Sequence, residues 1–284
     1  MSYYPFPRGQ GRIVDCTFLR RIRFDERTMT VKTSDGFALT ILPNDHIGRH
    51  LYLTGQFDRT IVEVLLRFSQ KNDRILDIGA NIGYVSCALL RQVKGSRVVS
   101  VEPQPLVYEL LAQNVKSIGG GRARPIRAAV SDADGRGTLV IAEGNTGASR
   151  LVSLESRNAS SGSNGPSGSK TAGKEITVDL ISGNELMRCS GLDRVDLIKI
   201  DVEGHEDVVL STLTPVIERD RPRAIVFEHQ GDLCSCSSSI GRRFKSLHYE
   251  IFGVRKTLTR WRLVSLADLT RSRRLSHDYL ARPH

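Results

Sequence analysis

Hydrophobic positions between residues 73 and 230 follow a repeated order of apolar run, turn and amphipathic segment. The apolar runs are nearly continuous, which is typical of strands covered on both faces. Strands that alternate with helices in this way form parallel sheets with crossover connections, so the pattern predicts an α/β fold. We expect strands at 74–80, 96–103, 123–132, 175–181, 195–202 and 223–230, and helices at 83–93, 105–119, 184–191 and 205–220.

The segments on either side of this alternation have their own patterns. Two alternating runs in residues 28–43 flank Ser34-Asp35-Gly36, which predicts a hairpin. Asp58 precedes an amphipathic stretch and is the expected N-cap of a helix over 58–70. At the other end we expect a helix at 240–248 and strands at 249–258 and 261–266. The predicted organisation is therefore a β-rich N-terminal cap (1–57), an α/β domain (58–266) and a basic C-terminal tail (267–284).

Residues 155–174, "ESRNASSGSNGPSGSKTAGK", interrupt the α/β domain. They are rich in Ser, Gly and Asn and have little to bury, which predicts a flexible surface loop. A loop of this length in a compact domain is typical of a lid or an insertion. Together with the N-terminal strands, it is expected to form a cap over the molecule that the protein acts on.

Composition narrows the class of protein. With 284 residues, 39% hydrophobic and 25% charged, the chain has the balance of a globular domain. Five cysteines, an odd number, argue against a disulfide framework, and no apolar run is long enough to predict a transmembrane segment. We therefore expect a cytoplasmic protein. The net charge of +10 favours acidic partners in general, but no motif for specific nucleic-acid binding accompanies it.

The turn "DIGANIG", from Asp77 to Gly83, lies where a parallel sheet binds its ligand. It lacks the spacing of a dinucleotide turn and carries a carboxylate, which suits a cationic ligand better than a pyrophosphate. Glu102 ends the next strand, where an acid can accept the hydroxyls of a ribose, and Pro103 stops that strand. Asp132 follows the third strand and either faces an adenine amino group or belongs to the turn "DADG". A nucleoside with a positive sulfur and no phosphates, S-adenosylmethionine, fits this set.

Four motifs in this order, "ILDIGANIGYVS", "VEPQP", "AAVSDADG" and "DLIKIDVEGHE", resemble the FkbM family of class I methyltransferases. The resemblance covers roughly residues 35 to 253. It implies a Rossmann-like, seven-stranded class I methyltransferase sheet, here with a small β-rich cap, and S-adenosylmethionine as the donor. It also implies methylation of a hydroxyl on a sugar, glycoconjugate or small natural product. The resemblance places Gly79 and Asn81 at the methionine end of the donor and Glu102 at its ribose.

The candidate cofactor-binding residues come from the ends of the first three strands of the alternation. One alternative stays open for Asp77, which either touches the ligand or orients the turn through hydrogen bonds. The full set is Asp77, Gly79, Ala80, Asn81, Gly83, Glu102, Pro103, Ser131 and Asp132.

The stretch "LIKIDVEGHE" places several ionisable side chains at the end of the fourth strand. It contains neither the Pro-Pro motif of enzymes that methylate base amino groups nor the Pro-Cys nucleophile of cytosine C5 enzymes. Transfer to a hydroxyl instead calls for a general base. The candidate catalytic residues are Asp201, Glu203, His205 and, from the end of the fifth strand, Glu228, with Asp201 preferred.

Several neighbours have structural interpretations. Glu206 and Asp207 fall in the first turn of a helix, where acids complement the helix dipole. His205 is either a base near neutral pH or a helix-start residue. Lys199, in an apolar strand, is expected to pair with an acid. A Mg²⁺ site formed by Asp201, Glu203 and Glu228 is a less favoured alternative.

Two other functions remain open from the sequence. One is methylation of RNA ribose or of protein, and the other is a non-catalytic nucleoside-binding scaffold with the same fold. The sequence predicts neither the acceptor nor the oligomeric state.

Overall fold

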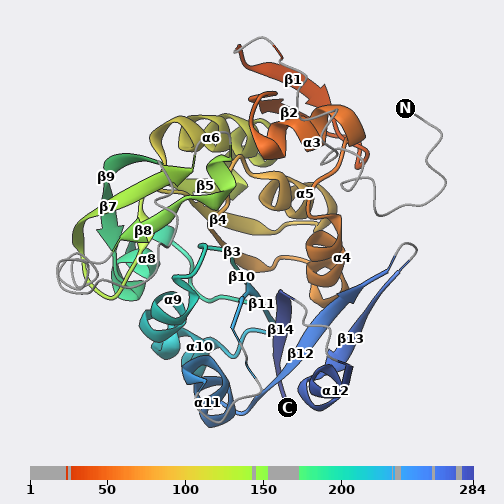
Figure 1. Ribbon diagram of the computed structural model, residues 1–284, viewed down its shortest axis with the longest axis vertical. Coiled ribbons are helices and arrows are strands. Elements are labelled where there is room, and N and C mark those ends of the chain that lie inside the picture. The colour runs from red at the N-terminus through yellow and green to blue at the C-terminus, as the bar shows by residue number, and fades with distance from the viewer. Residues whose placement is uncertain are drawn as a thin grey trace, which may run out of the picture.

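The computed structural model describes residues 24, 27–142, 145–152, 173–231, 233, 238–257, 260–272 and 277–284. Its centre is an eight-stranded mixed sheet, and the five strands at its β5 side run parallel (Figure 1). The α/β fold with a parallel core is therefore confirmed. In order across the sheet, the strands are β13 (Trp261–Ser265), β12 (Tyr249–Lys256), β14 (Asp278–Pro283), β11 (Ala224–Glu228), β10 (Leu197–Ile200), β3 (Arg74–Ile78), β4 (Arg97–Val101) and β5 (Ala123–Ile126).

Helices cover both faces of this sheet. Successive strand residues point to opposite faces, so both faces carry apolar side chains that the helices bury. In β3, for example, Ile75 belongs to one hydrophobic core and Leu76 to the other. The first core includes α4 (Arg59–Phe68), α5 (Tyr84–Gln92) and α6 (Pro105–Gly119). The second includes α8 (Gly183–Ser190), α9 (Glu206–Thr212), α10 (Thr214–Asp220), α11 (Ser239–Ser246) and α12 (Leu266–Ser272).

The helix expected over 205–220 is two helices, α9 and α10, which meet at Leu213. Pro215 lies in the first turn of α10, where its missing N–H has no intrahelical partner to lose. None of the described helices combines the length and the apolar character that crossing a bilayer requires.

The hairpin predicted near the N-terminus is present as β1 (Met29–Lys32) and β2 (Ala38–Ile41). It is followed by α3 (His46–Thr54), a helix that the sequence analysis did not predict. Asp45 begins this helix, because its Oδ2 accepts a hydrogen bond from the Ile47 N–H at 3.1 Å. Residues 1–23 of the expected cap lie outside the described part of the chain.

A smaller four-stranded sheet lies beside β5, at the left of Figure 1. The strand expected over 123–132 is divided between the two sheets, as β5 in one and β6 in the other. Of the predicted loop 155–174, positions 155–172 lie outside the described residues. The smaller sheet has the order β6 (Ala129–Val130), β9 (Gly173–Ile181), β7 (Gly135–Ala142) and β8 (Arg150–Val152). A short 3-10 turn, η2 (Thr146–Ala148), lies between β7 and β8, and another, η1 (Gly120–Arg122), connects α6 to β5 of the large sheet.

The last residues of the chain correct one expectation. Within the predicted basic tail, residues 278–283 form β14, which lies between β12 and β11 and runs antiparallel to both. Tyr279, Leu280 and Ala281 are almost completely buried. The basic run "RSRR" next to this strand led to the prediction of a tail. The burial of the strand depends on β11 and β12, which pair with it and are distant in the sequence. The seven strands expected by resemblance are thus present, with β13 as an eighth at the edge.

Two leucine truncations test whether β14 is part of the core. Leu280→Ala should lower the free energy of unfolding by about 2–5 kcal/mol, because it leaves a cavity in a packed core. Leu106→Ala is the matched control, since this leucine is 53% exposed, and should change it by no more than about 0.5 kcal/mol. The measurement is urea unfolding of both variants, and equal small effects would contradict the packing of β14.

Candidate active site

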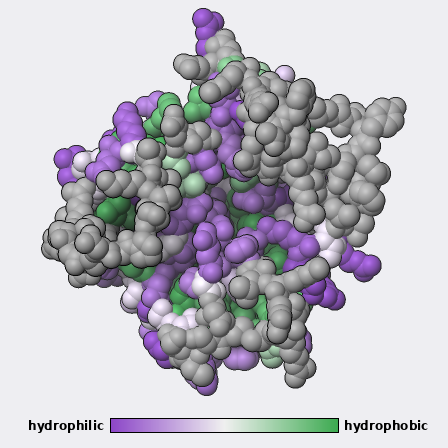
Figure 2. Space-filling model, viewed as in Figure 1, coloured by the Kyte–Doolittle hydropathy of each residue, from purple (hydrophilic) through white to green (hydrophobic). Residues whose placement is uncertain are grey.

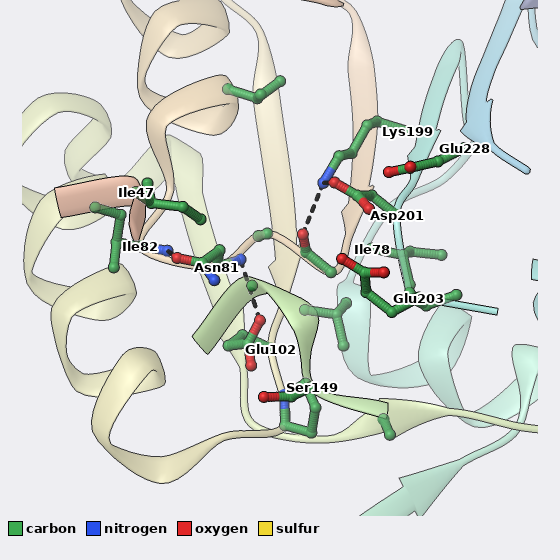
Figure 3. Close-up of a pocket in the computed structure, with 18 of the residues that line it drawn as sticks. Ile47, Ile78, Asn81, Ile82, Glu102, Ser149, Lys199, Asp201, Glu203 and Glu228 are labelled. Carbon is green, nitrogen blue, oxygen red and sulfur yellow. Dashed lines mark hydrogen bonds and ion pairs between the residues drawn. The ribbon is translucent and has the colours of Figure 1, made fainter. Parts of the chain in front are cut away.

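A cleft lies past the carboxyl ends of β3, β4, β10 and β11, which is where parallel sheets place their ligands. The cavity has a volume of about 250 Å³. Hydrophilic side chains gather near the centre of the face shown in Figure 2. In the close-up of Figure 3, Asn81 and Glu102 lie on one side of the pocket, and Asp201, Glu203 and Glu228 lie on the other.

The turn after β3 forms the floor of this pocket. Gly79 and Ala80 each donate a backbone hydrogen bond of 3.0 Å to the Val101 carbonyl. Gly79 has a φ of +75°, and a Cβ built on it would lie 1.8 Å from the carbonyl oxygen of Asp201. Glycine is therefore required at this position by close approach of the end of β10 as well as by its dihedral angle.

Glu102, at the end of β4, is fixed by two backbone groups. Its Oε2 accepts from the Asn81 N–H at 3.1 Å and its Oε1 accepts from the Gln104 N–H at 3.0 Å. Burial raises the pKa of this carboxyl to about 7, although the two hydrogen bonds favour the ionised form. A carboxylate has about four acceptor positions, so Glu102 retains capacity for two further donors. This geometry fits the paired hydroxyls of a ribose.

The ammonium of Lys199 links β10 to β3. It donates to the Gly79 carbonyl at 2.6 Å and lies 3.3 Å from Asp77 Oδ1 and 3.4 Å from Asp201 Oδ2. Burial lowers the pKa of Lys199, but the carboxylates of Asp77 and Asp201 outweigh burial and raise it overall. Lys199 therefore stays charged, and the expectation that it pairs with an acid is confirmed.

The chain turns into α9 after β10 through Glu203, which has a φ of +50°. Glu206 is buried, and its Oε1 accepts hydrogen bonds from the N–H groups of Val202 and Gly204. Its structural role is therefore confirmed. The carboxylate of Glu203 instead lines the pocket, where burial and then Asp201 raise its pKa to about 7.

His205 also lines the pocket, and its Nε2 lies 3.5 Å from Ser131 Oγ. Burial lowers the pKa of His205 against the opposing effect of Asp132. The imidazole is therefore neutral at pH 7 and can accept a proton.

Glu228 faces the same space from the end of β11. Burial raises the pKa of this carboxyl to about 8, and the carboxylates of Asp201, Asp278, Glu203 and Asp58 add to the shift. Asp58, at the start of α4, corrects another expectation, because it has a φ of +44° and its side chain does not cap the helix. The Asp58 carboxylate lines the pocket, where burial and Asp201 raise its pKa to about 6.

The structure brings most of the predicted site residues to this pocket. The residues that line it are Gly79, Ala80, Asn81, Glu102, Pro103, Asp201, Glu203, His205 and Glu228.

Four predicted cofactor residues do not line the pocket. Asp77 is fully buried, and its Oδ2 accepts from Ser86 Oγ at 2.6 Å, so it orients the turn together with Lys199. Gly83 packs beneath α6, because a Cβ there would lie 2.7 Å from Leu111. Ser131 is buried and its hydroxyl donates to Asp132, which is exposed in the turn.

Asp58 is an acidic residue of the pocket that the sequence did not predict there. An acid before an amphipathic helix is typical of an N-cap, and only the left-handed backbone conformation of Asp58 shows otherwise. Ile47 of α3 and Ser149 near β8 also line the pocket, and no local sequence pattern predicted them. In the part of the chain that the structure describes, no group of three His, Cys, Asp or Glu side chains is arranged to hold a metal ion.

The methyltransferase FkbM domain profile matches residues 77–244, more than half of the chain. The chain therefore belongs to the FkbM methyltransferase family. It is an enzyme that takes its methyl group from S-adenosylmethionine, and the paired acceptor positions of Glu102 together with the close-fitting glycine turn suit that donor. The scaffold alternative is thereby set aside.

Two relatives show sequence similarity. The hexuronic acid methyltransferase AglP of Haloferax volcanii is 26% identical over 194 residues, covering 68% of this chain and 71% of that protein. The methyltransferase sdnD of Sordaria araneosa is 31% identical over 160 residues, covering 49% of this chain and 60% of that protein.

Solved structures of methyltransferases also align with the chain. The crystal structure of methyltransferase FkbM from Methylobacillus flagellatus is 15% identical, with a TM-score of 0.42 over 84% of this chain and 53% of that one. The O-methyltransferase from Bacillus cereus in complex with SAH is 13% identical, with a TM-score of 0.44 over 81% and 83%.

A substitution of Gly79 tests whether the turn after β3 is part of the donor site. Gly79→Ala should weaken the binding of S-adenosylhomocysteine roughly tenfold or more, because the turn must move away from β10. Calorimetric titration measures this affinity. Gly121→Ala is the control, since a Cβ there meets nothing within 4 Å, and it should bind as wild type does. Wild-type affinity in Gly79→Ala would contradict the assigned role of the turn.

Proposed function

We propose that this enzyme transfers the methyl group to a hydroxyl oxygen of a sugar, glycoconjugate or small natural product. The similarity to a methyltransferase named for hexuronic acid supports a carbohydrate acceptor. The observation that carries the proposal is the carboxylate of Glu203, which lines the pocket near Asp201 and has no hydrogen-bond or ion-pair partner among the described residues. A hydroxyl acceptor must lose a proton during methyl transfer, and a positioned carboxylate can take it.

Different residues of the pocket bind the donor and accept the proton in this proposal. S-adenosylmethionine, when bound, supplies a methyl group activated by a positive sulfur. Glu102 and the turn at Gly79 hold the donor, and Lys199 forms ion pairs with Asp77 and Asp201 beside it.

Among the candidate bases, Glu203 has the best-matched environment. Asp201, preferred from sequence, lies 3.4 Å from the ammonium of Lys199, whereas Glu203 has no ion-pair partner among the described residues. Burial and the Asp201 charge instead raise the pKa of Glu203 to about 7, close to the value at which a base is both ionised and effective near neutral pH. His205 is the second candidate, because its imidazole is neutral and faces the same pocket.

Substitution of the proposed base separates chemistry from binding. Glu203→Gln should lower kcat by roughly 10²–10⁴-fold with little change in affinity for S-adenosylhomocysteine. The wild-type rate should fall as the pH falls below about 7, because protonated Glu203 cannot accept a proton, and the variant should lose this pH dependence. Mass spectrometry over a panel of hydroxyl acceptors measures the transfer.

Asp207→Asn is the matched control, because Asp207 contacts Ser239 and Arg243 outside the pocket. If Glu203→Gln keeps the wild-type rate and pH profile while His205→Asn loses activity, His205 is the base instead. Transfer to RNA or protein, but to none of the small or glycan acceptors, would contradict the proposed acceptor class.

A further inference from the structure

Three carboxylates of the pocket, those of Asp58, Glu203 and Glu228, lack a partner within the described part of the chain. No described residue donates a hydrogen bond to any of them or forms an ion pair with it. Buried or half-buried carboxylates are usually paired, because an unpaired charge loses its hydration without compensation. Their natural partners are therefore donors supplied by a ligand.

The nearest lysines are already engaged. Lys199 forms ion pairs with Asp77 and Asp201 and donates a hydrogen bond to the Gly79 carbonyl. Lys256 lies 2.6 Å from Asp278, which is paired with Glu228 in the register of β14 and β11. The end of the pocket formed by α4 and β11 consequently has an excess of carboxyl groups over cations among its described residues.

The charges around Asp58 and Glu228 agree with this excess. Burial raises the pKa of both carboxyls, and neighbouring acids raise it further. Asp58 faces Asp201 and Asp278, with Lys256 and Lys199 as the opposing cations. Glu228 faces Asp201, Asp278, Glu203 and Asp58. A positive group placed between Asp58 and Glu228 would relieve this repulsion, whereas a carboxylate would increase it.

This acidic end is separate from the side that holds the donor. Glu228 lies across the pocket from Asn81 and Glu102 in Figure 3. Asp58 comes from the start of α4, where its backbone conformation is left-handed, and its side chain lines the pocket and makes no cap hydrogen bond to the helix. Both residues are thus placed to contact the acceptor.

We propose that the acceptor carries an amino group near the methylated hydroxyl, as an amino sugar does, and that Asp58 and Glu228 bind its ammonium. This inference rests on the proposed function and specifies the acceptor within it. Asp58 and Glu228 are specificity-determining residues, and Glu203 remains the proton acceptor. A uronic acid, the substrate class in the name of the relative AglP, should be disfavoured.

Binding of three methyl glycosides tests this proposal at pH 7. The protein is saturated with S-adenosylhomocysteine and titrated with methyl glucosaminide, methyl glucoside and methyl glucuronide. The glucosaminide should bind roughly tenfold more tightly than the glucoside, with the glucuronide weakest. Asp58→Asn and Glu228→Gln should each reduce this preference, whereas Asp207→Asn should preserve it. Thermal unfolding checks that each variant is folded.

Equal affinities, tighter binding of the glucuronide, an unchanged preference in both pocket variants, or no binding of any glycoside would overturn the proposal. Methyl transfer to the same glycosides is measured in parallel. Transfer to the glucoside without preference for the amine would overturn the amino-group inference and leave the proposed function standing. Failure of the proposed function would instead appear as transfer only to RNA or protein.

Discussion

The site depends on the ion pairs that the buried ammonium of Lys199 forms with Asp77 and Asp201. The ammonium connects a carboxylate in the middle of the sheet, Asp77, to the carbonyl of Gly79 and to Asp201 at the edge of the pocket. Removing one member of a buried ion pair costs about 3–5 kcal/mol, because the other charge remains without compensation. The cluster therefore holds the end of β10 against the turn after β3, and the pocket opens directly above it.

The Lys199 cluster has two consequences for the pocket. The turn and β10 approach so closely that only glycine fits at position 79. The Lys199 ammonium lies within 3.4 Å of Asp77 and Asp201, whereas the carboxyl groups of Glu203, Glu228 and Asp58 form no ion pair with any residue in the described part of the chain. This distribution of charged groups is the basis for the proposed base and for the proposed class of acceptor.

Much of this arrangement could be predicted from sequence because it depends on local patterns. Continuous apolar runs identified β3, β4, β10 and β11, and strand ends placed Gly79, Glu102 and Asp201 at one edge. The predictions that failed concern residues whose structure depends on partners distant in the sequence. Leu280 is buried only because β11 and β12 flank it, and Asp58 has the sequence context of an N-cap but a backbone conformation imposed by the fold. Gly83 matches a ligand-binding motif, yet it packs against Leu111 of α6. Asp77 accepts a hydrogen bond from Ser86, which agrees with one of the two roles that the sequence left open for it.

The most direct test of this account is the affinity for S-adenosylhomocysteine when the lysine is replaced. Lys199→Met removes the charge and retains much of the side-chain volume, and Lys199→Met/Asp77→Asn also removes the carboxylate left behind. Calorimetric titration of both proteins should show affinity weakened by roughly tenfold or more, even where the double variant recovers stability. Wild-type affinity in either folded variant would show that the pocket forms without the Lys199 cluster.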